Sequence, residues 1–220
     1  MDFKKYATKH HNINSLYFDD YFNKQSKKSS QYLDDGFSPA LFDVFSKLLN
    51  DRIIFLNTEL ESGVCNLIKA QLLYLESVSD DDISIYIDSP GGSVYSGLGL
   101  LDVMDYIKPD IETINTGLAA SMAAVILCSG TKGKRKALKR SRTMIHQPMT
   151  FGSYMQQATD IEIEAKEMNS LKKELYEIIS ETTGQKYDKV YQDSERDYWM
   201  SSVEAKKYGM VDKIIEKRKK

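Results

Sequence analysis

The sequence predicts an α/β fold built on a largely parallel sheet. Short apolar segments with the alternation of strands are separated by amphipathic helical segments over most of the chain. This alternation is typical of βαβ units joined by right-handed crossovers. The length of 220 residues suits one domain of ordinary size, and the apolar content of 41% is enough for a substantial core.

Composition excludes several classes of function. The formal net charge is −2, so a basic surface for nucleic acid is not expected. No apolar run approaches the ~20 residues of a membrane span, and residues 1–20 lack the apolar core of a secretory signal. Cys65 and Cys128 fall in apolar-periodic segments without metal-ligand spacing, which favours buried free thiols. We therefore expect a cytoplasmic protein that binds neither nucleic acid nor membrane.

Residues 1–37 are predicted to form a flexible N-terminal arm, and residues 38–220 the folded domain. The arm is polar and rich in Tyr and Lys, and its segment 25–36 (QSKKSSQYLDDG) is typical of a mobile loop. Its histidines, His10 and His11, lack partners at metal-ligand spacing and are expected to be exposed tail residues.

The first half of the domain contains two units of strand and helix. Helices are predicted where apolar residues recur on one face, and strands where they alternate or cluster. In chain order, these elements are a helix over 38–49, a strand over 51–56, a helix over 62–76, a strand over 83–87 and a helix over 94–107. The last helix ends before Pro109, because the residue before a proline disfavours helical geometry.

The second half supplies the remaining elements. They are a strand over 110–115 (DIETIN), an Ala-rich helix over 121–129, a basic loop with a short strand over 131–140, a strand over 143–147 (TMIHQ) and a long helix over 158–183. Gly184 ends the long helix. The last helix begins with a capping box formed by Ser201 and Glu204 and closes at Gly209.

Ser121 is the candidate nucleophile. It lies in the segment 116–124 (TGLAASMAA), between a predicted strand and a predicted helix. A strand, a tight turn of small residues, a serine and a helix expose a reactive oxygen at a helix N-terminus. The free N–H groups of the first helical turn can then face a developing negative charge. The alternative is a small-residue packing contact in which Ser121 merely caps the helix.

His146 is the candidate general base. It is the only histidine outside the arm, so it is the only imidazole in the folded domain. The alternative is a structural histidine that donates a hydrogen bond. A base of this kind needs an orienting carboxylate. Asp193, Glu195 and Asp197 are candidates, and the residues alone do not choose among them.

The turn Pro90-Gly91-Gly92 is the candidate oxyanion hole. Two glycines let the backbone bend sharply and leave an N–H uncovered, although an ordinary strand-to-helix turn is the alternative. Metal-assisted hydrolysis is disfavoured, because no set of His and carboxylate residues has ligand spacing. No GxxxxGK[ST] loop occurs, so the chain itself is not expected to use ATP.

Long segments of the chain resemble the proteolytic subunits of Clp proteases, the ClpP family. The resemblance runs in collinear order over about residues 42–215. Its segments are IDSPGGSVYSGLGLLDVMDYIKPD (87–110), TGLAASMAA (116–124), KGKRKALKRSRTMIHQP (132–148), QATDIEIEAKEM (157–168) and DSERDYWMSSVEAKKYGMVD (193–212). Motifs of this length are highly specific.

The resemblance implies a site. By it, Ser121 is the nucleophile, His146 the general base and Asp197 the third member of a triad. The backbone N–H groups of Gly92 and Met122 would form the oxyanion hole, and no metal or cofactor is implied.

The resemblance also implies an architecture and partners. The fold would be the ClpP/crotonase βαβ superhelix with a projecting handle, a strand plus a long helix at about 148–183. Family members form homo-oligomers of two stacked seven-membered rings, which enclose the active sites. An AAA+ unfoldase of the ClpX, ClpA or ClpC type docks on the rings and uses ATP to thread unfolded polypeptides inward. Tyr86, Tyr106 and Ile215 match the positions of the docking pockets.

Two segments depart from the family pattern. The usual glycine-rich segment after His-Gln-Pro reads MTFGSYMQ (149–156) here, and its bulk could narrow the substrate groove. The arm is longer than the family's axial loop and is either a propeptide or an axial gate. Two rival functions remain open at this point. One is a catalytically silent structural ring subunit, and the other is a crotonase-type acyl-CoA enzyme, which needs no triad.

Overall fold

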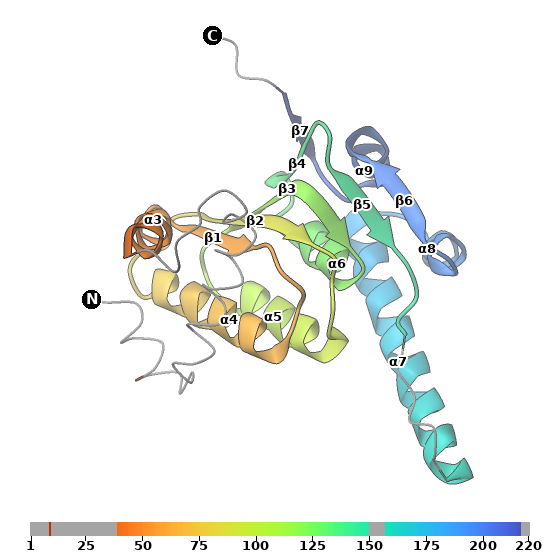
Figure 1. Ribbon diagram of the computed structural model, residues 1–220. Coiled ribbons are helices and arrows are strands. Elements are labelled where there is room, and N and C mark those ends of the chain that lie inside the picture. Colours follow the sequence, from red (N-terminus) through yellow and green to blue (C-terminus); the bar gives the residue numbers. More distant parts are fainter. Residues whose placement is uncertain (1–8, 10–38, 150–156, 217–220) are drawn as a thin grey trace.

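The computed structural model describes residues 9, 39–149 and 157–216 (Figure 1). The predictions for the N-terminal arm, including His10 and His11, lie outside these described residues. So does most of the segment 149–156, where the strand of the predicted handle would fall.

The predicted α/β class is confirmed. In the described part of the chain, seven strands form one sheet, with the order β1-β2-β3-β4-β7 and a branch of β5 and β6. The strands are β1 (Ile53–Leu56), β2 (Ile83–Ser89), β3 (Ile111–Ala120), β4 (Arg135–Leu138), β5 (Arg142–Ile145), β6 (Tyr198–Ser201) and β7 (Lys213–Ile215). Every pairing is parallel except that of β5 with β6.

The helices follow the predicted ones closely, with one addition. They are α3 (Pro39–Asn50), α4 (Ser62–Glu76), α5 (Val94–Tyr106), α6 (Met122–Cys128), α7 (Ala158–Thr183), α8 (Tyr187–Ser194) and α9 (Ser202–Tyr208). The capping box of Ser201 and Glu204 is present, as predicted. The sequence patterns do not predict α8, β6 or β7.

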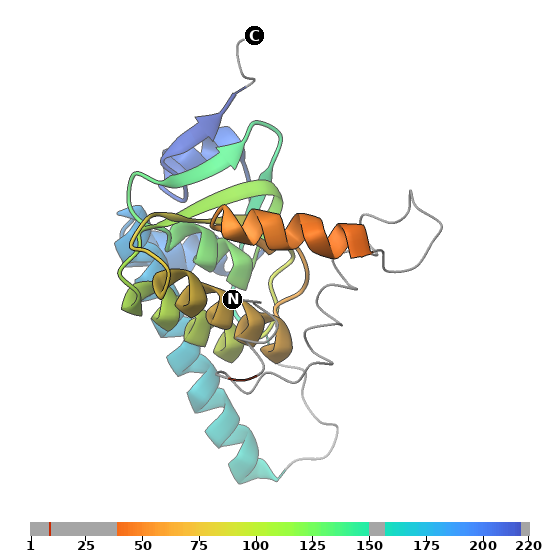
Figure 2. The same cartoon turned by 90° about the vertical axis from the view of Figure 1, so that its left-hand side faces the viewer.

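The core lies between the sheet and the helices α4, α5 and α6. Figures 1 and 2 show α4 and α5 on one side of the sheet and α3 beside the edge strand β1. All seven residues of α6 are buried, so this helix has a fixed position against the sheet. The free thiols Cys65 and Cys128 are buried, as predicted. None of the helices in the described ranges combines the length and the apolar character needed to cross a bilayer.

β3 is the strand on which the sheet branches, and it is longer than predicted. Its first half pairs with β4, at Thr113–Asn115, and its end pairs with β5, at Leu118–Ala120. The buried Asn115 joins the two branches, because its Nδ2 donates to the carbonyl of Arg142 at 2.8 Å and to Thr143 Oγ1 at 3.2 Å. The small-residue turn predicted at 116–120 is therefore wrong. Backbone pairing of Leu118–Ala120 with β5, and of Ala119 with β2, extends the strand despite the low strand propensity of Gly and Ala.

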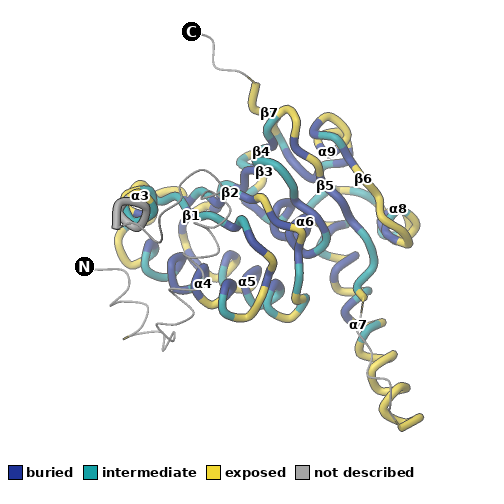
Figure 3. Tube along the Cα trace, in the orientation of Figure 1, coloured by how far each residue is buried: buried dark blue, intermediate teal, exposed yellow. Residues whose placement is uncertain are grey.

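α7 leaves the body of the protein. Its first half is almost wholly exposed, whereas Leu171, Leu175, Tyr176 and Ile179 are buried where the helix meets α6 and α8 (Figure 3). The exposed half therefore projects from the sheet and its covering helices, as Figures 1 and 2 show.

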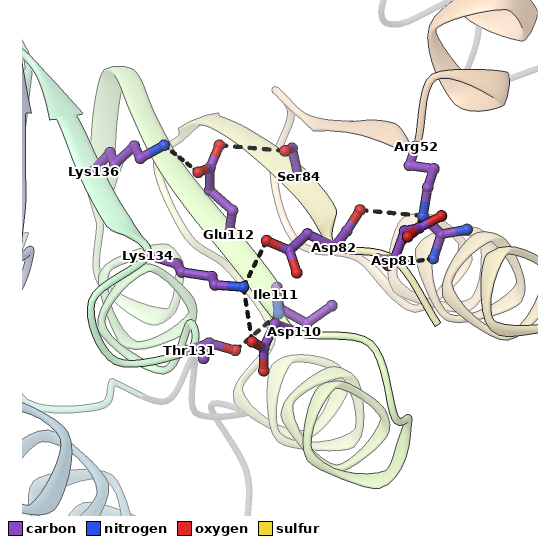
Figure 4. A network of polar contacts seen from close by, with 10 residues as sticks. All are labelled: Arg52, Asp81, Asp82, Ser84, Asp110, Ile111, Glu112, Thr131, Lys134 and Lys136. Carbon is purple, nitrogen blue, oxygen red and sulfur yellow. Dashed lines mark hydrogen bonds and ion pairs between the residues drawn. The ribbon is translucent and has the colours of Figure 1, made fainter. Parts of the chain in front are cut away.

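A network of charged side chains joins the amino ends of the strands (Figure 4). Lys134 Nζ lies 2.6 Å from Asp82 Oδ2 and 2.8 Å from Asp110 Oδ2, and Lys136 pairs with Glu112. These contacts tie the starts of β2, β3 and β4 together. Exposed pairs of this kind contribute modestly to stability, so we assign this edge a structural role.

Candidate active site

Ser121 stands between β3 and α6 in a strained backbone conformation. Its φ is 56° and its ψ is −129°, which a residue with a Cβ rarely adopts. Its N–H donates to the carbonyl of Met144 at 2.8 Å, so the neighbouring β5 holds the turn. Its side chain makes no cap hydrogen bond to α6. The capping alternative is therefore wrong, and the hydroxyl is available for another partner.

That partner is His146. Its Nε2 lies 2.8 Å from Ser121 Oγ, and its Nδ1 lies 3.1 Å from Asp197 Oδ1. The imidazole is largely buried, with 13% of its side chain exposed, whereas the Asp197 side chain is 60% exposed. Hydroxyl, imidazole and carboxylate thus form one continuous hydrogen-bonded series, which is the arrangement that activates a serine oxygen.

The pairing of β5 with β6 explains why Asp197 reaches the imidazole. The antiparallel ladder ends with Ile145 opposite Tyr198. Continuing that register by one residue puts His146 opposite Asp197, and side chains at directly opposed positions are within contact distance.

The other two acidic candidates are engaged elsewhere. Asp193 Oδ2 lies 2.6 Å from Lys189 Nζ, one helical turn earlier. Glu195 Oε1 lies 2.7 Å from Lys172 Nζ, and this hydrogen bond lowers the pKa of Glu195. Of the three acids that the sequence left open, the geometry brings only Asp197 to the imidazole.

The glycine turn lies directly against Ser121. Gly91 has a φ of 93°, and a Cβ placed on it would lie 2.7 Å from Ser121 Cβ and 3.0 Å from Met122 N. Only glycine fits this position. Among the described residues, the N–H groups of Gly92 and Met122 have no hydrogen-bond acceptor.

Buried contacts hold the glycine turn in place. Ser89 Oγ accepts from Gly91 N at 3.2 Å and donates to the carbonyl of Thr58 at 2.6 Å. Leu60 pairs with the turn from the other side, with its N–H donating to Gly91 O at 2.8 Å. Sequence analysis did not single out Ser89, although a serine immediately before Pro-Gly-Gly is a common turn-forming residue.

A groove of about 790 Å³ runs over Ser121 and His146. Residues of the glycine turn and α5 form one wall, and the first half of α7 forms the other. The Tyr95 hydroxyl spans the two walls by donating to Glu167 Oε1 at 3.1 Å. Next to Ser121 lies a smaller apolar pocket, lined by Val94, Met122, Val125, Ile145, Leu175 and Ile179.

The predicted docking residues do not form one cluster within a single chain. Tyr86 is half-buried on β2 and packs against Phe55, with ring centroids 5.5 Å apart. Ile215 lies on β7, which is separated from β2 by β3 and β4 in the sheet, and is 36% exposed. Tyr106 is the last residue of α5 and is 78% exposed.

Comparison with known proteins decides the family. Residues 37–218 match the family described as Clp protease. The chain belongs to the Clp protease family. It is 53% identical to an ATP-dependent Clp protease proteolytic subunit of Bacteroides fragilis over 220 residues, which cover 99% of both chains. The same description applies to a Porphyromonas gingivalis protein, 53% identical over all of this chain and 99% of that one.

A less similar relative matches over a shorter span. Proteolytic subunit 2 of a Synechococcus strain is 50% identical over 186 residues, covering 84% of this chain and 93% of its own length. Membership in the Clp protease family confirms the predicted resemblance and the predicted class of enzyme, a serine peptidase.

Proposed function

We propose that Ser121, His146 and Asp197 are the catalytic triad of a serine endopeptidase that cleaves unfolded polypeptides. The observation that carries this proposal is the unbroken hydrogen-bonded series from Ser121 Oγ through both nitrogens of His146 to Asp197. With this series in place, activation of the Ser121 hydroxyl requires no other group among the described residues.

In the acylation step, Ser121 Oγ attacks the peptide carbonyl while His146 Nε2 takes the hydroxyl proton. Asp197 accepts the hydrogen bond from Nδ1–H and stabilises the imidazolium that forms. The oxygen of the tetrahedral intermediate accepts hydrogen bonds from the N–H groups of Gly92 and Met122. When the intermediate collapses, the C–N bond breaks and His146 returns its proton to the leaving amine.

In the deacylation step, a water molecule replaces the leaving amine. His146 takes a proton from the water as its oxygen attacks the ester carbonyl of the acyl-enzyme. The same two N–H groups stabilise the second oxyanion. Cleavage of the C–Oγ bond releases a carboxylic acid, and Ser121 regains its proton from His146. Enzyme and imidazole return to their starting states.

The wider assembly is part of the same proposal. The chain forms two stacked seven-membered rings, and an AAA+ unfoldase feeds substrate into them. The relatives' names describe ATP-dependent proteases, whereas this sequence has no GxxxxGK[ST] loop, so a partner would consume the ATP. The exposed half of α7 offers surface for contacts between subunits. The exposed Tyr106 and Ile215, with Tyr86, would serve the unfoldase.

A substitution of the nucleophile tests the proposal. Purified wild-type protein should cleave a fluorogenic peptide, and Ser121→Ala should lower kcat by several orders of magnitude. A fluorophosphonate probe should label the wild type at Ser121, as located by peptide mass spectrometry. Ser77→Ala, an exposed serine outside the groove, is the control and should keep full activity. Native mass spectrometry should show all three proteins at about fourteen times the 25.1 kDa chain mass.

Two outcomes would contradict the proposal. Cleavage that persists in Ser121→Ala would mean that another group is the nucleophile. An assembled ring that the probe does not label would instead favour a catalytically silent structural subunit.

A further inference from the structure

Lys172, on α7, contacts both the segment that carries His146 and the segment that carries Asp197. Gln147, the residue after His146, donates through Nε2 to the carbonyl of Glu195 at 3.0 Å. Lys172 Nζ donates to Gln147 Oε1 at 3.3 Å and to Glu195 Oε1 at 2.7 Å. Glu195 itself lies two residues before Asp197. Lys172 therefore touches both segments at once.

The surroundings of Lys172 keep its ammonium group charged and in place. The hydrogen bond to Glu195 raises the pKa of Lys172, and only 16% of its side chain is exposed. The ammonium lies 4.4 Å from the ring centroid of Tyr191 and 5.6 Å from that of Tyr176. Such cation–π contacts add to an ion pair when the cation is partly desolvated. A single geometry is thus favoured for this side chain.

The contacts lie where backbone pairing stops. The ladder of β5 and β6 ends at Ile145 and Tyr198, so no backbone hydrogen bond of that ladder holds His146 against Asp197. The Asp197 carboxylate is mostly exposed, and water competes for it. The ladder sets the register, and side-chain contacts just beyond its last pair can hold His146 and Asp197 together where the backbone pairing has ended.

We propose that Lys172 is a positioning residue for peptide hydrolysis, which holds the Asp197 segment against the His146 segment and anchors both to α7. It touches neither the substrate nor the reacting atoms. It acts at the place where the projecting helix first packs on the body of the protein, next to the buried Leu171 and Leu175. The inference rests on the proposed roles of Ser121, His146 and Asp197.

Substitution of Lys172 tests the inference through the split between kcat and KM. Lys172→Met keeps much of the aliphatic length and removes the charge and the donors. A displacement of about 1 Å at a catalytic group can cost roughly 100-fold in rate. We expect kcat for the fluorogenic peptide, and the rate of fluorophosphonate labelling, to fall about 10- to 100-fold. KM should stay within about twofold, because the groove is unchanged. Lys172→Arg, which keeps charge and donors, should restore most of the rate.

The adjacent lysine is the matched control. Lys173 pairs with Glu177 one turn later on the exposed face of α7, with Nζ and Oε1 3.6 Å apart. Lys173→Met should leave kcat, KM and the labelling rate unchanged. Equal kinetics of Lys172→Met and Lys173→Met would overturn the inference. If the wild-type protein itself neither cleaves the peptide nor reacts with the probe, the proposed function is wrong instead.

A second pair of variants keeps the inference testable if Lys172→Met folds or assembles poorly. Glu195→Gln weakens the ion pair, and Gln147→Ala removes the link to the Glu195 carbonyl. Each should lower kcat severalfold without raising KM, with thermal unfolding close to that of the wild type. If both variants keep the wild-type kcat, the inference is wrong.

Discussion

Adding one methyl group to the glycine turn should disable the site. In Gly91→Ala, the new Cβ would lie 2.6 Å from the carbonyl oxygen of Ala120 and 2.7 Å from Ser121 Cβ. Ordinary contact begins at 3.4 Å, so the turn must move by about 0.8 Å away from Ser121. The N–H of Gly92 would move with it, away from the position of the oxyanion.

Two separate costs set the size of the effect on stability. A side chain at a φ of 93° costs about 1–2 kcal/mol, as left-handed backbone does in L-residues. Overpacking against a buried turn costs about 1–3 kcal/mol more. The free energy of unfolding should therefore fall by about 2–5 kcal/mol. The displacement of the turn should lower kcat/KM roughly 100-fold in the molecules that remain folded.

The assay compares Gly91→Ala with Gly133→Ala. Gly133 has nearly the same φ, 91°, but no atom lies within 4 Å of a Cβ placed there. Chemical unfolding and peptide cleavage are measured for both variants. Gly133→Ala reports the cost of backbone strain alone, and the difference between the two variants reports the steric clash at Gly91. Gly133→Ala should lose about 1–2 kcal/mol of stability and no activity. If kcat/KM of Gly91→Ala lies within about threefold of that of Gly133→Ala, the turn does not position the oxyanion donors.

Two further substitutions test the carboxylates. Asp197→Asn should lower kcat roughly 10⁴-fold, because an amide favours the wrong tautomer of His146, while Asp193→Asn should stay near the wild type in the same peptide assay. Asp212→Asn should lower the free energy of unfolding by about 3–5 kcal/mol at pH 7, measured with denaturant, because it leaves the buried Arg135 without its counter-charge. Burial raises the pKa of Asp212, but the hydrogen bonds and charge of Arg135 more than offset this, so the net pKa lies below the ordinary 3.8. The wild type should therefore lose this stabilisation only as pH falls below about 3.8, and Asp212→Asn should show no such loss.

Local patterns were enough to propose Ser121 as the nucleophile and to locate the glycine turn that lies against it. Ser121 directly follows a strand, and the two glycines follow another strand after Pro90. Small residues around a serine at the start of a helix form a local motif that can be recognised without tertiary contacts. His146 could be found by elimination, because the domain contains no other imidazole.

Asp197, the proposed third member of the triad, could not be predicted from residue types alone. Its identity depends on the register of β5 with β6, and β6 has only four residues, of which Tyr198 and Trp199 are exposed. Four residues are too few to show the alternation of apolar and polar side chains by which a strand is recognised in a sequence. The resemblance to ClpP supplied Asp197, and the geometry supports it independently.

The missed contacts share a cause. Lys172 lies among charged residues on a helix and has the sequence signature of an exposed face, so only the tertiary fold reveals its contacts with Gln147 and Glu195. Likewise, the residues 116–120 have low strand propensity, and pairing with β2 and β5 overrides it.

The direction of the strands explains why the site forms at one edge of the sheet. β2, β3 and β5 run parallel, so the glycine turn, Ser121 and His146, which follow them, all emerge at the carboxyl ends. β6 runs the opposite way, and Asp197 precedes it, so the carboxylate begins at that same edge. The strain at Ser121 can persist there because α6 is wholly buried and cannot shift to relieve it. A change that loosens α6 should therefore relax the backbone of Ser121 before it unfolds the sheet.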